Sequence, residues 1–104
     1  DLYVPSNEPN LSMKFTDWLR SGGGGTILAA NNMRFYSAQS STAFSQSTAM
    51  YITGSGVYSS PITMTGDLGG APSGMRHIQI TVEIKVPSGT QMGTYTSDFG
   101  IRTQ

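Results

Sequence analysis

The most regular pattern in the chain covers residues 75–86, where apolar and polar side chains alternate. The side chains of a β-strand point alternately to opposite faces, so this spacing predicts one long strand with an apolar and a polar face. We expect the apolar face to pack on the core of an antiparallel sheet that is covered on one side. That face carries five branched aliphatic residues: Ile78, Ile80, Val82, Ile84 and Val86.

Shorter alternating segments, separated by turn residues, fill the rest of the chain. They predict strands over residues 11–16, 26–30, 33–36, 49–53, 62–65 and 94–103. No segment repeats apolar residues at helical spacing, so we expect no helix longer than one or two turns. About seven short strands with frequent turns are typical of an antiparallel sandwich or barrel.

The connections between these strands are rich in glycine, serine and proline. Residues 21–25 contain four glycines, but no Gly-Lys-Ser/Thr follows, so a hairpin turn is predicted rather than a phosphate-binding loop. Residues 37–48 are polar and predict a loop with one short strand at Phe44. Residues 87–93 predict a wide hairpin loop that joins the long strand to the last one.

Residues 1–10 predict an extended N-terminal segment. Pro5 and Pro9 restrict the backbone to β or polyproline geometry around them. Leu2 and Val4 share one side of this segment, and Tyr3 lies on the other. Such a segment can pair with the free edge of its own sheet or of a neighbouring subunit, so Leu2, Tyr3 and Val4 form a candidate assembly segment.

The chain has 104 residues and no cysteine, which predicts a single domain over residues 1–104 without disulfides. Six basic and six acidic side chains give a net charge of zero, which argues against a nucleic-acid partner. Only 12% of the residues are charged, and serine, threonine and asparagine supply most of the polarity. This composition is common in secreted and cell-surface β proteins, so we expect an extracellular location. No apolar run approaches the roughly 18 residues of a membrane span, so no insertion into a membrane is expected, and no signal peptide is visible.

Catalytic chemistry has few candidates in this sequence. His77 is the only histidine and is expected on the polar face of the long strand. With one histidine and no cysteine, a zinc-type site lacks ligands, and no Gly-x-Ser-x-Gly motif provides a nucleophile. We therefore expect no catalytic, cofactor-binding or metal-binding residues, and no enzymatic activity. A pair of carboxylates beside a sugar cleft stays open as a reserve alternative, although a domain of this size rarely supports one.

Aromatic residues provide candidates for ligand stacking as well as for the core. Their rings can cover sugar rings when exposed, or anchor the sandwich when buried. The candidates are Trp18, Tyr36, Tyr51 and Tyr58.

The C-terminal quarter carries a recognisable arrangement of residues. Residues 84–90 read Ile-Lys-Val-Pro-Ser-Gly-Thr and residues 93–96 read Gly-Thr-Tyr-Thr, followed by an alternating tail. This resembles the end of the immunoglobulin-like β-sandwich modules of bacterial surface and secreted proteins, including fimbrial subunits. The resemblance implies an immunoglobulin-like antiparallel sandwich with a structural or adhesive role. In the fimbrial version, an N-terminal extension is donated as a strand to the next subunit.

These observations together predict a non-catalytic structural or adhesive module of a bacterial extracellular surface protein, with a fimbrial subunit as one form. The alternative is a carbohydrate-binding module of a secreted enzyme. The expected partners are accordingly protein, through self-assembly or neighbouring domains, or carbohydrate.

Overall fold

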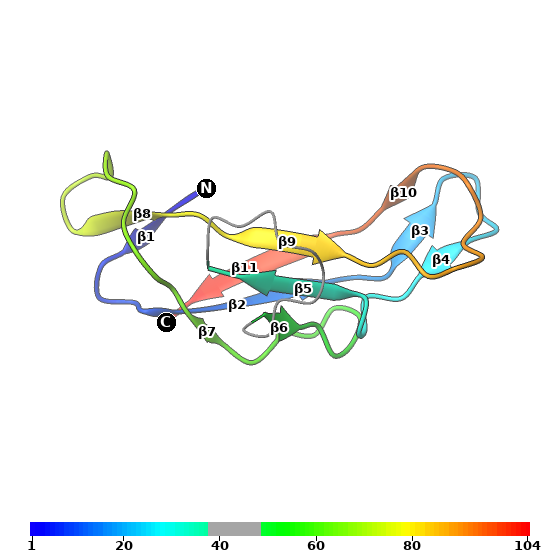
Figure 1. The fold of residues 1–104 in the computed structure, drawn as a ribbon, viewed down its shortest axis with the longest axis horizontal. Coiled ribbons are helices and arrows are strands. Elements are labelled where there is room, and N and C mark those ends of the chain that lie inside the picture. The colour runs from blue at the N-terminus through cyan, green and yellow to red at the C-terminus, as the bar shows by residue number, and fades with distance from the viewer. Residues whose placement is uncertain (38–48) are drawn as a thin grey trace.

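The computed structural model describes residues 1–37 and 49–104, and its regular elements are all β-strands (Figure 1). Within these residues no helix is long and apolar enough to cross a bilayer. The loop with a short strand at Phe44 that the sequence predicts lies outside the described residues. The strands are β1 (Leu2–Pro5), β2 (Asn10–Phe15), β3 (Trp18–Arg20), β4 (Thr26–Ile27), β5 (Met33–Tyr36), β6 (Met50–Tyr51), β7 (Ile62–Thr63), β8 (Met75–Ile78), β9 (Thr81–Ile84), β10 (Tyr95–Thr96) and β11 (Phe99–Thr103).

The strands form four small sheets in the described part of the chain, and every pair is antiparallel. The sheet orders are β1-β8, β10-β3-β4, β11-β2-β7 and β6-β5-β9. The all-β, antiparallel character is therefore confirmed. The eleven strands of the described residues do not collect into two continuous sheets.

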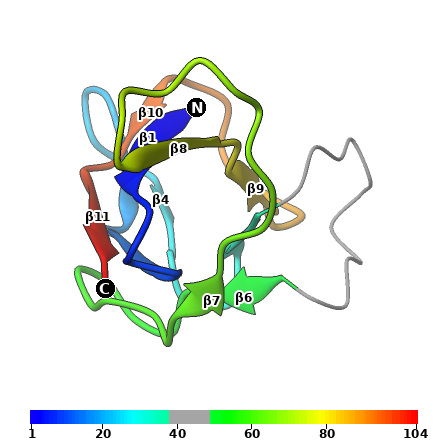
Figure 2. The same cartoon turned by 90° about the vertical axis from the view of Figure 1, so that its left-hand side faces the viewer.

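The four sheets follow one another along an elongated molecule of 47 × 23 × 23 Å. The β1-β8 pair lies at one end and the β10-β3-β4 sheet at the other, with the two remaining sheets between them (Figure 1). Seen along the molecule, β11 lies on one side and β9 on the other (Figure 2). The two middle sheets thus supply two facing walls.

The core lies between these walls. Ser12, expected on the polar face of β2, is fully buried, whereas Lys14 on the same face is half-buried. As the sequence predicts, Leu11, Met13 and Phe15 of β2 are buried. They meet Met33 and Phe35 of β5, together with Val4, Ile52, Met64 and Ile78. Each such aliphatic or aromatic side chain contributes about 1.5–3 kcal/mol by leaving water.

The predicted long strand over residues 75–86 is divided in two, and most of its expected core face is exposed. The break falls at Gln79 and Ile80, where β8 ends before β9 begins. Ile78 is buried and Ile80 is half-buried. Val82, Ile84 and Val86 are 41%, 38% and 57% exposed. The expectation is wrong for these three residues, because no strand among residues 1–37 and 49–104 covers the inner face of β9.

The hairpin expected around residues 87–93 is also absent from the observed pairing. The chain leaves β9, forms β10 on β3, and only then forms β11 on β2. The strands on either side of the loop therefore stand on different walls. The glycine-rich turn is confirmed, since β3 and β4 pair with Trp18 opposite Ile27 and Leu19 opposite Thr26.

The N-terminal segment pairs with β8 of its own chain, which is the first of the two arrangements considered for it. Leu2 lies opposite Ile78, and Pro5 lies opposite Met75. Val4 is buried in the core, whereas Tyr3 is 55% exposed, so the predicted alternation of this segment is confirmed.

Candidate functional site

An apolar groove opens between β9 and β11 in the middle of the molecule. It encloses about 300 Å³, and its surface is almost entirely apolar. We refer to it as the groove, which is lined by Met13, Phe15, Trp18, Met33, Val82, Ile84 and Phe99. Because its apolar side chains are open to solvent, the groove is the candidate binding site of the described residues.

Both long sides of the groove are the unpaired edges of sheets. In the described residues β9 pairs only with β5, and β11 pairs only with β2. The amide of Lys85 donates to the carbonyl of Asn32, and the amide of Gln104 donates to the carbonyl of Asn10. Hydrogen bonding alternates along an antiparallel strand, so the intervening residues direct their amides and carbonyls away from the partner, toward the open edge. These residues are Val82 and Ile84 on β9, and Phe99 and Ile101 on β11.

Trp18 and Met33 belong to the floor of the groove. The Trp18 indole Nε1 donates to the Met33 sulfur at 3.2 Å, which satisfies the one polar atom of the ring. The backbone beside Trp18 is fixed by Asp17, whose carboxylate accepts the amide of Ala29 at 2.8 Å. Trp18 is therefore half-buried and also lines the groove. Its position is compatible with both roles considered for it from the sequence, a core anchor and a ligand-stacking residue.

Phe99 forms the opposite rim. It is 66% exposed, and its ring centre lies 6.2 Å from that of the buried Phe15. Ile101 follows on the same strand and is 37% exposed. The sequence predicts an alternating strand here but gives no signal that its apolar residues stay uncovered.

The outer side of β9 is held by a polar cluster. Arg34 donates from Nε and Nη2 to one carboxylate oxygen of Glu83 at 2.8 and 2.6 Å, and the Tyr36 hydroxyl donates to the other oxygen at 2.7 Å. The Arg34 and Glu83 side chains are only 1% and 16% exposed. The Tyr36 hydroxyl, with the Arg34 guanidinium, holds the pKa of the Glu83 carboxyl below its usual value. This cluster fixes β9 from behind, so the wall of the groove is firm without cover on its inner face.

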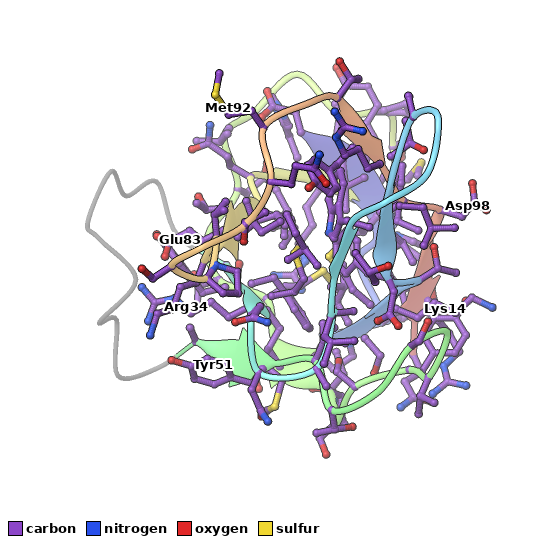
Figure 3. All side chains as sticks on the ribbon, turned by 90° about the vertical axis from the view of Figure 1, so that its right-hand side faces the viewer. Lys14, Arg34, Tyr51, Glu83, Met92 and Asp98 are labelled. Carbon is purple, nitrogen blue, oxygen red and sulfur yellow. The ribbon has the colours of Figure 1, made fainter. Side chains whose placement is uncertain are left out.

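The four candidate stacking residues do not form one platform. Trp18 lines the groove, whereas Tyr36 is buried and bonded to Glu83. Tyr51 is 39% exposed on β6, beside Arg34 of β5. Tyr58 lies on the outer face of the β11-β2-β7 sheet, under Lys14 and Arg102. Figure 3 shows Arg34, Glu83 and Tyr51 on one side of the molecule, with Lys14 and Asp98 on the other.

His77 is part of the contact between β1 and β8 rather than a solvated surface residue. Its ring lies edge-on to Tyr3, with 5.2 Å between centroids. Its two nitrogens lie 3.1 Å from the Asp1 carboxylate and 3.0 Å from the Gly69 carbonyl oxygen. The nearby Asp67 accepts the amides of Gly69 and His77, and these hydrogen bonds lower the pKa of its carboxyl. The contacts join the N-terminal strand to the loop before β8.

No group of three or more histidine and carboxylate side chains is placed to hold a metal ion among residues 1–37 and 49–104. The expectation that the chain has no catalytic, cofactor or metal site stays a prediction.

Comparison with known proteins gives no match. No family model, no curated protein and no solved structure matches this chain. The resemblance to immunoglobulin-like surface modules thus remains a hypothesis, and the groove has to be interpreted from its own chemistry.

Proposed function

We propose that this chain is a non-catalytic structural or adhesive module of a bacterial extracellular surface protein, and that it associates with other proteins by accepting an extended segment into the groove. A fimbrial subunit is one form of such a module. The observation that carries the proposal is an apolar groove flanked on both sides by unpaired strand edges.

Two features of the groove favour an extended segment as the occupant. The exposed backbone groups of Val82 and Ile84 on one side, and of Phe99 and Ile101 on the other, need hydrogen-bond partners along a line, which a strand supplies. The side chains of a strand alternate, so every second residue of the occupant would enter the apolar space between the walls. β9 has four residues and β11 has five, so a segment of about five residues matches both edges.

The accepted strand also accounts for the expected fold. The middle of the molecule has two three-stranded sheets, β11-β2-β7 and β6-β5-β9. A strand added between β11 and β9 would bring them to seven strands, the number expected of an immunoglobulin-like sandwich. In this proposal, the exposed aliphatic residues of the predicted long strand are uncovered because the strand that covers them comes from another chain. Val82 and Ile84 face the groove, and Val86 faces the loop beyond it.

A peptide-binding titration tests the proposal. The probe is an eight-residue peptide with a lysine at each end and alternating threonine and valine between them, and Trp18 fluorescence reports binding because Trp18 is the only tryptophan and lines the groove. We expect Val82→Asp to weaken binding at least ten-fold, since it places a charge in the groove. Val86→Asp is the matched control, because Val86 is also exposed but does not line the groove.

Several outcomes would contradict the proposal. Equal binding by both variants would remove the groove as the site, and so would equal weakening. A scrambled peptide without alternation that binds as well as the alternating one would exclude strand addition. Circular dichroism verifies that each variant is folded, and Phe99→Ser repeats the test from the other wall, where the side chain is 66% exposed.

The source of the donated segment is a separate question. If a second copy of this chain supplies it, the purified protein is expected to form a ladder of oligomers that survives mild detergent and disappears in Val82→Asp. If another protein supplies it, the purified chain stays monomeric and still binds the peptide.

The alternative function is a carbohydrate-binding module of a secreted enzyme. It is favoured by Tyr51, which is 39% exposed on the outer side of the β6-β5-β9 sheet. Retention on a polysaccharide column that Tyr51→Ala abolishes and Val82→Asp leaves unchanged would support this alternative. Retention that neither substitution changes would exclude Tyr51 as the site.

A further inference from the structure

Two basic side chains converge on one aromatic ring on the outer face of the β11-β2-β7 sheet. Lys14 Nζ lies 4.8 Å from the ring centre of Tyr58, and Arg102 Cζ lies 4.4 Å from it. The ring lies close over Gly100, where an added Cβ would come 3.0 Å from the tyrosine hydroxyl and 2.8 Å from Lys14 Cε. Gly100 therefore provides the space in which the three side chains close over the strand.

Neither cation has a carboxylate partner in the described residues. The ion pairs found there join Arg34 to Glu83 and His77 to Asp1, away from this face. Cation–π attraction to Tyr58 holds both charges in place, so a ligand would lose less side-chain entropy in fixing them. An acidic group of a ligand would supply the carboxylate partner that each cation lacks in the described residues.

A small cleft adjoins Lys14, the first of the two cations. It encloses about 170 Å³ and is lined by Lys14, Thr16, Gly56, Asp98 and Phe99. This volume is below the roughly 300–1,000 Å³ of sites that enclose a whole drug-sized ligand, so it suits one unit of a larger ligand. Phe99 offers an exposed apolar ring at the rim.

Asp98 decides which class of anion fits. Its carboxylate accepts no hydrogen bond from the described residues and is exposed, so it can accept hydroxyl groups of a ligand. The combination of two cations, a hydroxyl acceptor and an aromatic rim favours a ligand that carries both hydroxyl and acidic groups on each unit.

We propose that this face, comprising Lys14, Tyr58, Arg102 and the cleft at Asp98, binds acidic polysaccharides of the hexuronate type. Carboxylates of the polymer pair with Lys14 and Arg102, and hydroxyls of the sugar unit at Lys14 reach Asp98. The site shares Phe99 with the groove, but Val82 and Ile84 of the groove take no part in it, so substitutions at these two residues distinguish it from strand acceptance.

Affinity electrophoresis and titration with polygalacturonate test this site, with dextran as the neutral polysaccharide. We expect binding to polygalacturonate and not to dextran, with an affinity that falls as salt is raised. Lys14→Gln and Arg102→Gln should each weaken binding at least five-fold. Lys85→Gln is the matched control, since it removes one exposed positive charge from the end of β9, and it should change the affinity less than two-fold.

Three results would overturn the proposal. An equal loss in all three glutamine variants shows attraction by overall charge rather than a site. Equal binding of polyglutamate shows that an acidic peptide suffices, and equal binding of dextran shows that the acidic group is unnecessary. Val82→Asp should bind polygalacturonate as the unaltered chain does, so a failure of strand acceptance is distinguishable from a failure of this site.

Discussion

β8 and β9 both belong to the predicted long strand but are anchored in opposite ways. In β8 the apolar side chain is inside, and Ile78 is 1% exposed. In β9 the polar side is the more enclosed one, since the Glu83 side chain is 16% exposed, whereas Val82 and Ile84 are about 40% exposed. The two segments are separated by only two residues, Gln79 and Ile80.

The difference lies in what covers each segment. β1 pairs along β8, and Val4 of β1 joins Ile78 in the core. β9 has β5 on one edge, an open edge on the other, and the groove in front of its apolar side chains. Alternation therefore determines which side chains share a face, and the neighbouring strands determine whether that face is buried.

The largest expected effect is the difference in stability between a substitution in β8 and the same substitution in β9. Ile78→Ala removes buried methyl groups and should lower the free energy of unfolding by about 2–5 kcal/mol. Ile84→Ala, which makes the same change in a side chain that is 38% exposed, should lower it by less than about 1 kcal/mol. Urea unfolding of both variants provides the measurement. Equal losses would mean that β9 is covered in solution as β8 is.

A smaller effect should appear in the pH dependence of the polar anchor of β9. The pKa of Glu83 is lowered in the folded chain by Tyr36 and Arg34, so its ionised form stabilises the fold. This contribution is fully present above the usual glutamate pKa of about 4.5 and is lost as the pH falls through the lowered folded value. Glu83→Gln should thus melt below the unaltered chain at pH 7, and the difference should shrink below pH 4.5.

Because the two proteins are compared at each pH, the other carboxyls affect both melting temperatures equally and do not contribute to the difference. Asp67, whose pKa is also lowered, titrates in both proteins and drops out of the difference. A melting difference that stays constant from pH 7 to pH 3 would show that Glu83 does not anchor β9 through its charge.

The smallest effect on stability is expected at the C-terminal end of the predicted long strand. Val86 is 57% exposed, beyond the last residue of β9, so Val86→Thr should change the free energy of unfolding by no more than about 0.5 kcal/mol. In a core, the added hydroxyl of the same substitution would be costly. A loss above 1 kcal/mol would show that the apolar face continues into a covered region.

Several features could be predicted from the sequence because they depend on local geometry. Alternation in residues 2–4 predicts both sides of β1 correctly, and in residues 11–15 it predicts the buried side of β2, although Ser12 on the expected polar side is buried as well. The glycine-rich turn is also local, since Gly22, Gly23 and Gly24 all adopt positive φ angles that other residues rarely accept. The all-β, antiparallel class follows from these short-range signals.

The candidate site could not be predicted in the same way. Trp18 was a candidate from the sequence, but Phe99 and Met13 gave no sign that they would line a common groove with it. Their meeting depends on β10 joining β3 and β11 joining β2, so that the loop after β9 crosses to the other wall instead of forming a hairpin. These pairings join residues far apart in the chain. Apolar residues alternate with polar ones both in a covered strand and in a strand at an open edge, so the alternation does not distinguish the two.

Local sequence was enough to predict that this protein is built of short antiparallel strands and which side chains share each face, because both follow from backbone geometry over a few residues. The break of the best alternating segment at Gln79 and Ile80, and the exposure of Val82 and Ile84 on an open groove, are visible only in the folded chain. They could not be predicted because burial depends on the partner across the core. For β9 this chain supplies Glu83, Arg34 and Tyr36 behind the strand, and no strand in front of it within the described residues.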